Sequence, residues 1–337
     1  MHVLILGAGA LGSLLGSRLS QTDAKVSLLS TNREHIQAIR RGGLMVEELD
    51  GSTQCYPVAA YDHPGSIAEA PDLVLVAVKT YSIEEAVSDI IAHCGPGTLF
   101  LTLQNGVGNW ERIALMVGKE PVLVGTTSQG STLVEPGRVR HGGNGPTFMG
   151  EPHGPPSPRV RSVVELFHRA GFKTEARDRM EQLVWEKLHA NVGINAITAL
   201  TGIRNGFIAE TPVARALCRA AVEEAMLVAR TKGFEISDDM VERVLAIARA
   251  TARNRSSMGQ DVDRRNRTEI DAINGAIVAF GEQVHIPTPV NRTLTQLVKT
   301  LEASYLEDSG QRSVAGEEEG VNGSIQTDEL QKERDRP

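Results

Sequence analysis

The stretch HVLILGAGALG, residues 2–12, decides the fold of the N-terminal half of the chain. Its first five residues are mostly apolar and predict a short buried strand. Glycines follow at the spacing G-x-G-x-x-G, and Leu14, Leu15 and Leu19 then continue at helical spacing. A strand, a glycine-rich turn and a helix in this order are typical of the first unit of a dinucleotide-binding fold.

Each glycine of this turn has a mechanical role in such a fold. Gly7 allows the tight turn, Gly9 lets a pyrophosphate approach the backbone, and Gly12 lets the helix pack close to the strand. The free N–H groups at the helix start favour an anionic group. The alternative is a tight turn that binds no ligand. We predict cofactor contacts from the whole turn, which comprises Gly7, Ala8, Gly9, Ala10, Leu11 and Gly12.

The composition is that of an ordinary globular protein. The chain has 337 residues, of which 41% are hydrophobic and 23% charged, and this length predicts two domains better than one. A net charge of -7 argues against a broad nucleic-acid surface. Three scattered cysteines fit a reducing compartment. Because we see no signal-peptide pattern and no apolar run of about 18 residues, we expect a cytoplasmic protein that does not bind membranes.

Further strand candidates continue the pattern of the N-terminal unit. Residues 25–29, 72–78 and 98–103 are short β-prone runs with helical stretches between them. Strands that alternate with helices predict a doubly wound, mostly parallel α/β sheet. Residues 122–150 are rich in Gly, Thr and Val, which predicts hairpins or edge strands that extend this sheet.

The chain changes character past Asp178. Residues 179–230 and 238–285 are rich in Ala, Leu, Glu and Arg, with apolar positions at three- and four-residue spacing, so the second domain is predicted to be all-α. One more helix is expected from about Asn291 to Leu306. The expected parts are an NADP-binding Rossmann-like domain over 1–177, a helical substrate and catalytic domain over 178–308, and a disordered tail over 309–337.

The end of the second strand indicates which nicotinamide cofactor is preferred. It reads Ser30-Thr31-Asn32-Arg33 and holds no acidic residue of the kind that binds a ribose 2′-hydroxyl. Arg33 offers a guanidinium for a 2′-phosphate, which favours NADP over NAD. The alternative is a solvated arginine at a helix start.

Three polar residues lie at i, i+4 and i+8 on an otherwise apolar helix. Lys187, Asn191 and Asn195 advance about 40° per step and form one polar stripe of about two turns. Amides and a lysine on such a helix need partners, so the stripe predicts a polar site. The alternative is that the amides bond another helix. No spacing of His, Cys and carboxylates suggests a metal site.

A third polar cluster follows in the helical half. Residues 254–261 read NRSSMGQD, and residues 267–275 read RTEIDAING. Ser257 and Gln260 have the spacing of a capping box. Ser257 is therefore expected at a helix N-terminus, where a substrate carboxylate is also favoured.

Together these segments resemble the ketopantoate reductase family (2-dehydropantoate 2-reductases), NADPH-dependent enzymes of pantothenate synthesis. The resemblance covers about residues 1–300. It rests on the glycine turn, on the stripe of Lys187, and on residues 78–80, 104–106, 125–127, 254–257 and 268–271. It implies a cleft between a Rossmann-like domain and a helical domain that holds NADPH and a 2-oxo acid.

The resemblance also implies a role for each matching residue. Lys187 would be the general acid that protonates the ketone oxygen, where hydride addition builds negative charge. Glu269 would orient the site through the cofactor or the substrate hydroxyl, and its carboxylate would help to keep Lys187 charged. The cofactor side would include Lys79, Asn105, Ser131 and Glu269. The substrate pocket would comprise Asn105, Asn191, Asn195, Asn205, Asn254 and Ser257.

The leading expectation is NADPH-dependent reduction of 2-dehydropantoate to pantoate in vitamin B5 biosynthesis. A paralogous reductase of another 2-oxo acid or ketone is the first alternative, because a fold specifies its substrate poorly. A non-catalytic NADP-binding regulator is the second. Thr31 stands where the family pattern has an arginine, so the 2′-phosphate contact is open between Arg33 and another group. The expected partner is a small-molecule 2-oxo acid and not a nucleic acid, and the sequence leaves open whether the chain forms a homodimer.

Overall fold

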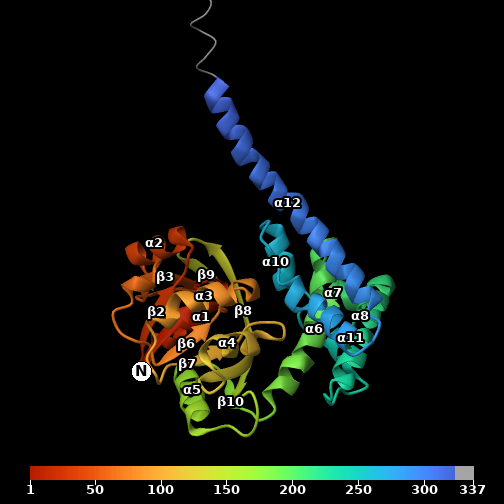
Figure 1. Cartoon of the computed structure of the whole chain (residues 1–337), viewed down its shortest axis with the longest axis horizontal. Helices are drawn as coiled ribbons and strands as arrows, with labels where there is room; N and C mark the ends of the chain where they lie inside the picture. The colour runs from red at the N-terminus through yellow and green to blue at the C-terminus, as the bar shows by residue number, and fades with distance from the viewer. Residues whose placement is uncertain (323–337) are drawn as a thin grey trace, which may run out of the picture.

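The structure is a computed structural model that describes residues 1–322, and within residues 308–322 it describes the helix but not the side chains. An α/β domain comes first, and a helical domain follows from Met180 (Figure 1). Both predicted domain types are therefore present. No helix within the described part of the chain is long and apolar enough to cross a membrane.

One sheet of ten strands forms the centre of the first domain. The strands are β1 (His2–Leu6), β2 (Lys25–Leu29), β3 (Leu44–Glu47), β4 (Thr53–Tyr56), β5 (Ala59–Tyr61), β6 (Leu73–Val76), β7 (Leu99–Thr102), β8 (Val122–Glu135), β9 (Arg138–Gly150) and β10 (Thr174–Ala176). Their order is β4-β3-β9-β8-β7-β6-β1-β2-β5, and β10 pairs with β9. All pairs from β8 to β5 in this order are parallel, as predicted for a mostly parallel sheet.

Helices cover both faces of the sheet because its central strands are apolar on both sides. These helices are α1 (Ala10–Leu19), α2 (Arg33–Gly42), α3 (Ile83–Ile91), α4 (Asn109–Val117) and α5 (Pro158–Arg169), with short 3-10 turns η1 (Pro64–Ser66) and η2 (Thr80–Ser82). On β1, Val3 and Ile5 pack into one core with α1, α2 and α5, whereas Leu4 and Leu6 pack into the other with α3 and α4. The sheet is thus doubly wound, as predicted.

The glycine- and threonine-rich segment forms a long hairpin. Strands β8 and β9 pair antiparallel, with register shifts between Thr127 and Glu135. The hairpin does not lie at the edge of the sheet, because β3 pairs with β9 on the side away from β8. Of the two predicted alternatives, the hairpin is confirmed, and its strands are inner strands of the sheet.

The second domain is built on one buried helix. Its helices are α6 (Met180–Thr201), α7 (Asn205–Glu210), α8 (Pro212–Thr231), α9 (Met240–Ala250), α10 (Ser257–Asp263), α11 (Asn274–Gln283) and α12 (Pro289–Asn322), with a 3-10 turn η3 (Ile270–Ala272). On α6, the ring of Trp185 stacks on Phe234 with centroids 5.0 Å apart and packs against Phe280 at 5.4 Å. Polar side chains on so apolar a helix must face a cavity or a polar partner.

The last helix is longer than predicted. We expected it to end near Leu306 and a tail to begin at residue 309, but α12 continues to Asn322 and extends away from the body of the protein (Figure 1). A helix that packing has already nucleated can continue without apolar contacts, so a composition poor in apolar residues does not reveal where it ends. Helix propensity does not explain the extension, because the added residues include Gly310, Gly316 and Gly320. Residues 323–337 of the predicted tail lie outside the described residues.

Candidate active site

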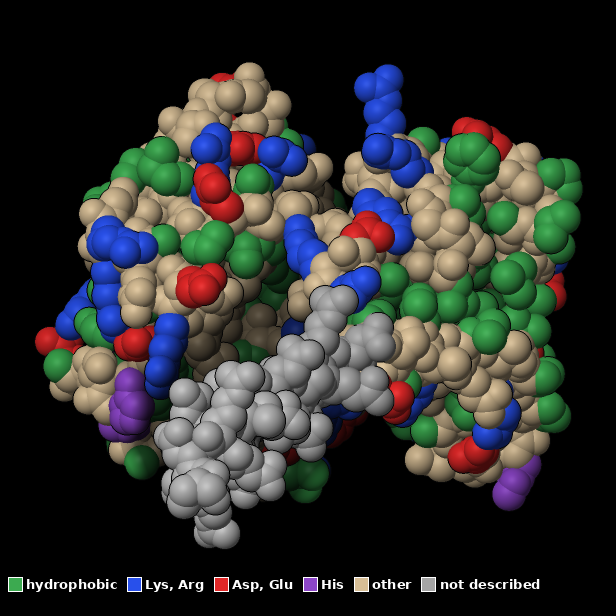
Figure 2. Space-filling model, turned by 90° about the horizontal axis from the view of Figure 1, so that it is seen from above, with side chains coloured by type: hydrophobic (Ala, Val, Ile, Leu, Met, Phe, Trp, Pro, Cys, Tyr) green, Lys and Arg blue, Asp and Glu red, His purple; other side chains and the backbone are tan. Residues whose placement is uncertain are grey.

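A cavity of about 1170 Å³ lies between the two domains. Figure 2 shows it as the cleft between two lobes of the surface. On the α/β side it is lined by the glycine turn, by residues at the ends of β1, β2, β6 and β7, and by residues 129–133 of the hairpin. Parallel strands present their carboxyl ends at one edge of a sheet, where ligands of such folds bind. The opposite wall comes from α6, residues 251–257, α10 and residues near Glu269.

The three glycines of the turn are required for different reasons. Gly7 has a φ of 106°, which favours glycine, and a Cβ at Gly12 would collide with the carbonyl oxygen of Gly7. These two glycines are therefore needed for the turn itself. A Cβ at Gly9 would meet no atom within 4 Å, and Gly9 lines the cavity. The turn thus leaves an open cradle over Gly9 at the start of α1, which fits an anionic pyrophosphate.

The end of β2 reaches the cavity through Ser30 and Thr31. Asn32 caps α2, its Oδ1 accepting a hydrogen bond from the backbone N–H of His35 at 3.1 Å. Arg33 is exposed, lies outside the cavity lining, and forms no hydrogen bond or ion pair through its side chain within the described residues. Its guanidinium therefore has no hydrogen-bonded partner there, although its charge helps to lower the pKa of Asp62.

One carboxylate lies beside the end of β2. Asp62 lines the cavity with Ser30 and Thr31, and its Oδ1 accepts a hydrogen bond from Arg40 Nη2 at 2.7 Å. This bond lowers the pKa of Asp62. The aspartate is therefore ionised, and its charge is matched by Arg40.

Lys187 lies behind Asn105, just outside the residues that line the cavity. Its Nζ donates hydrogen bonds to Oδ1 of Asn105 at 3.0 Å and to the carbonyl oxygen of Thr127 at 2.6 Å. Both acceptors are uncharged. Burial lowers the pKa of Lys187 to about 8, and the charge of Glu269 opposes this only in part. Lys187 thus keeps its proton near neutral pH but gives it up far more readily than an exposed lysine.

The charge of Glu269 raises the pKa of Lys187 as predicted, but only in part, and the ion-pair partner of this carboxylate is Lys79. Nζ of Lys79 lies 2.6 Å from Oδ2 of Asp261 and 3.6 Å from Oε2 of Glu269. The backbone N–H of Thr80 donates to Oε1 of Glu269 at 3.0 Å. Burial alone would lower the pKa of Lys79, but the two carboxylates raise it. This cluster joins the α/β domain to the helical domain across the cavity.

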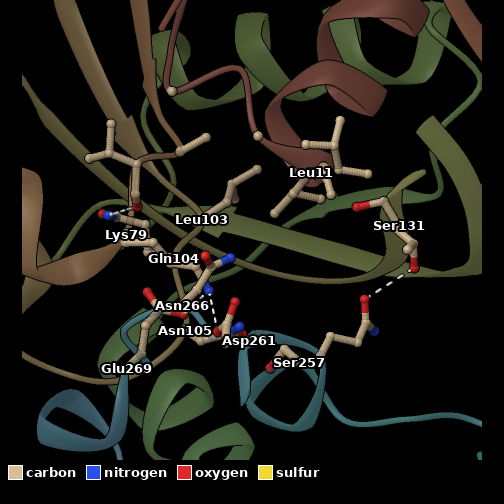
Figure 3. Close-up of a pocket in the computed structure, with 18 of the residues that line it drawn as sticks. Leu11, Lys79, Leu103, Gln104, Asn105, Ser131, Ser257, Asp261, Asn266 and Glu269 are labelled. Atoms are coloured by element: carbon tan, nitrogen blue, oxygen red, sulfur yellow. Dashed lines mark hydrogen bonds and ion pairs between the residues drawn. The ribbon is translucent and has the colours of Figure 1, made fainter. Parts of the chain in front are cut away.

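Figure 3 shows how these groups meet in the cavity. Lys79 and Asn105 enter from loops that follow strands of the sheet, and Asp261 and Glu269 enter from the helical domain. Sequence reasoning missed Asp261. It lies four residues after Ser257 on α10, and this spacing of one helical turn could have placed it on the same face.

The polar stripe of α6 faces the cavity beyond Lys187. Asn191 and Asn195 both line it. Nδ2 of Asn195 lies 3.5 Å from Oγ of Ser257 on α10, so the alternative of helix-to-helix bonding holds for this amide. Nδ2 of Asn191 is buried and has no partner within the described residues, so this cavity-lining residue keeps an unused donor.

The predicted capping box is wrong by one residue. Ser256 is the N-cap of α10, and its Oγ accepts from the N–H of Gly259 at 3.0 Å. The hydroxyl of Thr198 donates to the same Oγ at 2.6 Å, which ties the cap to α6. Ser257 is thereby the first residue of the helix, and its side chain lines the cavity.

Two further predicted residues form the outer part of the helical wall. The N–H of Asn205 donates to the carbonyl of Asn254 at 3.1 Å, and its Nδ2 donates to Oγ1 of Thr251 at 3.0 Å. The amide oxygen of Asn205 has no partner within the described residues. On the opposite wall, Ser131 lies on the hairpin and lines the same cavity (Figure 3).

The last helix holds the segment that carries Glu269. Glu302 on α12 is 7% exposed, and its Oε1 accepts from the N–H of Thr268 at 2.6 Å. The hydroxyl of Tyr305 donates to the carbonyl of Asn266 at 2.7 Å. Glu302 and Tyr305 on α12 therefore hold the wall that faces Lys79 in place.

The cavity brings together most of the predicted site residues. Those that line it are Gly7, Gly9, Ala10, Leu11, Lys79, Asn105, Ser131, Asn191, Asn195, Asn205, Asn254, Ser257 and Glu269. Ala8 and Gly12 lie within the turn but outside the lining. Arg33 and Lys187 also lie outside the lining, and Lys187 is bonded to Asn105.

Two family models match this chain. The model described as "Ketopantoate reductase PanE/ApbA" matches residues 3–154, and that described as "Ketopantoate reductase PanE/ApbA C terminal" matches residues 179–302. Their boundary falls where the α/β domain gives way to α6.

The chain belongs to the ketopantoate reductase family. A 2-dehydropantoate 2-reductase of Halobacterium salinarum is 40% identical over 299 residues, which span 89% of this chain and 98% of the relative. One from Pyrococcus horikoshii is 35% identical over 306 residues, 90% of this chain and 98% of the relative. The similarity to these relatives thus extends over both domains of this chain.

Two solved structures have the same fold as this chain. A PanE/ApbA family ketopantoate reductase from Ralstonia eutropha superposes with a TM-score of 0.84 at 31% identity, covering 91% of this chain and 100% of that chain. A ternary structure of D-mandelate dehydrogenase with NADH and anilino(oxo)acetate superposes with a TM-score of 0.85 at 26% identity, covering 90% of this chain and 99% of that chain. Proteins named ketopantoate reductase and D-mandelate dehydrogenase therefore share this fold.

Proposed function

We propose that this chain catalyses the NADPH-dependent reduction of 2-dehydropantoate to pantoate, a step of pantothenate synthesis. The observation that carries the proposal is the buried Lys187, whose pKa is lowered to about 8. It lies beside a cavity that is also lined by the open glycine turn and by amides without a partner within the described residues. Relatives with the name 2-dehydropantoate 2-reductase support the substrate.

The residues present fit a nicotinamide dinucleotide. The cradle over Gly9 would hold the pyrophosphate, and Leu11 and Ser131, which line the cavity near it, would contact the rest of the cofactor. Lys79 and Asn105 would lie on the nicotinamide side. A bound reduced nicotinamide supplies the hydride that the ketone carbon accepts.

The preference for NADPH rests on charge at the end of β2. Residues 30–33 include no carboxylate, and the nearby Asp62 is occupied by Arg40 at 2.7 Å. Arg33 is a free guanidinium at this end, suited to a 2′-phosphate. Titration of the protein with NADPH and NADH tests this. An Arg33→Gln variant is expected to bind NADPH more weakly and NADH equally well.

Lys187 is the proposed proton donor. Reduction of a ketone builds negative charge on its oxygen, and a general acid works best when its pKa lies near the working pH. The pKa of about 8 meets this condition, whereas an exposed lysine would hold its proton too firmly. Asn105 and the carbonyl of Thr127 fix the ammonium group. Lys187 would pass the proton to the ketone oxygen at the place where its hydrogen-bond partner Asn105 lines the cavity.

The substrate is proposed to lie against the helical wall. The free Nδ2 of Asn191 and the hydroxyl of Ser257 would bond its carboxylate and hydroxyl, with Asn195 holding Ser257 in place. Asn254 and Asn205 would complete the pocket. The contacts of Glu269 with Lys79 would hold the two walls of the cavity in fixed positions relative to each other.

Activity on another 2-oxo acid is the second candidate, and it is favoured by the similarity to D-mandelate dehydrogenase. Initial rates of NADPH oxidation with 2-dehydropantoate, pyruvate, 2-oxoisovalerate and phenylglyoxylate separate the two. We expect the highest kcat/KM with 2-dehydropantoate. A higher value with phenylglyoxylate would favour the second candidate, and binding of NADPH without any turnover would favour a regulator.

Two substitutions test the role of Lys187. Lys187→Ala is expected to slow hydride transfer about 10²–10⁴-fold while NADPH binding is largely retained. Lys187→Arg keeps a positive charge but is a far weaker acid, so it should also be slow if the lysine donates a proton. A fast Lys187→Arg variant would show that only a fixed charge is needed.

A further inference from the structure

The helical wall of the cavity carries a cation that no described residue neutralises. Three of the cations that line the cavity, Lys79, Arg140 and Arg255, each have a carboxylate within ion-pair distance. Arg253 also lines the cavity, is exposed, and forms no side-chain hydrogen bond or ion pair within the described residues. Its charge is therefore available to a ligand.

One other cavity-lining arginine has no carboxylate partner, but it is engaged. Nη2 of Arg264 donates to the carbonyl of Leu133 on the hairpin at 3.1 Å. This bond joins the two walls of the cleft, as does the bond from Thr132 Oγ1 to Gln260 Oε1 at 3.2 Å. Arg264 thus acts as a link between the domains, which leaves Arg253 as the free guanidinium.

The backbone of Arg253 is held although its side chain is free. The guanidinium of Arg204 donates to the carbonyl of Arg253, and the carbonyl of the next residue, Asn254, accepts from the N–H of Asn205 at 3.1 Å. Arg253 is four residues before Ser257, in the segment that lines the helical wall. Figure 2 shows Lys and Arg side chains along the rim of the cleft on this lobe.

The proposed substrate groups on this wall are all uncharged. Asn191, Asn195 and Ser257 offer neutral hydrogen bonds, which compensate a carboxylate for lost water less well than a charged donor does. Lys187, the proposed proton donor, is bound to Asn105 and to the carbonyl of Thr127. A guanidinium on the same wall can form two parallel bonds with a carboxylate, and its positive charge is what the neutral groups lack.

We propose that Arg253 recognises the carboxylate of the oxo acid and so selects charged 2-oxo acids over uncharged ketones. This inference rests on the proposed function, because it names the group that reads the substrate's charge. Arg253 acts on substrate capture and not on the chemical step.

The test compares Arg253→Gln and Arg253→Glu with the wild type on two substrates. One is 2-dehydropantoate, and the other is 2-dehydropantolactone, the lactone of the same acid, which has no carboxylate. We expect Arg253→Gln to raise KM for the acid about three- to tenfold with kcat unchanged, and Arg253→Glu to raise it further. Neither variant should change KM for the lactone or the Kd of NADPH. The kcat/KM of the wild type for the acid should also fall more steeply with ionic strength than that of Arg253→Gln.

A matched control is Arg249→Gln. Arg249 is exposed on α9, lies outside the cavity lining and has no side-chain partner within the described residues. Its substitution by Gln therefore removes the same net charge as Arg253→Gln without altering the site. An unchanged KM for the acid in Arg253→Gln, or equal effects of Arg253→Gln and Arg249→Gln, would overturn the inference alone. A wild type that does not reduce 2-dehydropantoate would overturn the proposed function and the inference with it.

Discussion

The buried ammonium of Lys187 should make the protein less stable at neutral pH than it would be without this charge. The pKa of Lys187 falls from 10.5 to about 8 because burial removes its water, and one pKa unit corresponds to about 1.36 kcal/mol. Between pH 8 and 10.5 the unfolded chain binds more protons at this residue than the folded chain does, so wild-type stability rises with pH in that window. Below pH 8 the full penalty, about 3 kcal/mol, is present.

The variant Lys187→Met isolates the free-energy cost of the buried charge. Methionine keeps much of the length and lacks the charge, so its stability has no contribution from this titration. The free energy of unfolding of the variant minus that of the wild type should therefore fall by about 1.3 kcal/mol between pH 7 and pH 9. Changes in packing and the loss of the bonds to Asn105 and Thr127 shift the difference in unfolding free energy by the same amount at every pH. The test therefore depends on how this difference changes with pH.

Urea unfolding followed by tryptophan fluorescence measures the difference. The chain has two tryptophans, of which Trp110 lies in the α/β domain and Trp185 lies on α6 beside Lys187. A Trp110→Phe background lets Trp185 report the helical domain alone. The same difference at pH 7 and pH 9 would mean that Lys187 titrates like an exposed lysine, and the argument for a tuned proton donor would fail with it.

Four further outcomes are expected. In kinetics from pH 6.5 to 10, kcat/KM for ketone reduction should fall about tenfold per pH unit above about pH 8, as Lys187 loses its proton. Gly9→Ala should weaken NADPH in a binding titration at least about tenfold, yet leave the free energy of unfolding within about 0.5 kcal/mol of wild type, because a Cβ there meets only the open cradle; equal binding would mean a turn without a ligand. Glu302→Gln should cost about 1–3 kcal/mol in urea unfolding, because it weakens the bond to the N–H of Thr268; no loss would show that α12 does not hold this segment. Deletion of residues 309–337 should leave initial rates unchanged, and a large loss would show that this segment supports the cleft.

Local patterns in the sequence predicted the parts of the fold that depend on neighbouring residues. The first strand was expected over residues 2–6 and lies at His2–Leu6, because its apolar run and the glycines after it leave little choice. The stripe from Lys187 to Asn195 was also readable, since a single helix places i, i+4 and i+8 on one face. The family resemblance then grouped residues that the cavity brings together.

Contacts between distant segments could not be read in the same way. The partners of Lys187 are 82 and 60 residues away in sequence, and Lys79 and Asp261 are 182 residues apart. Whether Ser256 or Ser257 caps α10 depends on a hydroxyl of α6, which no capping pattern contains. The sequence offered Glu269 as the companion of Lys187, and only the fold shows that Lys79 lies closer to it.

The helical wall is anchored by α12, which is the last of the described helices to be synthesised. A ribosome completes the whole sheet and the glycine turn when it has passed residue 176, about halfway along the chain. The segment with Thr268 and Glu269 is made later, and it lacks its anchors until Glu302 and Tyr305 have also been made. A nascent chain that stalls before residue 302 would therefore carry a complete dinucleotide cradle and an unsupported substrate wall, so it could take up cofactor from the cell without turning anything over.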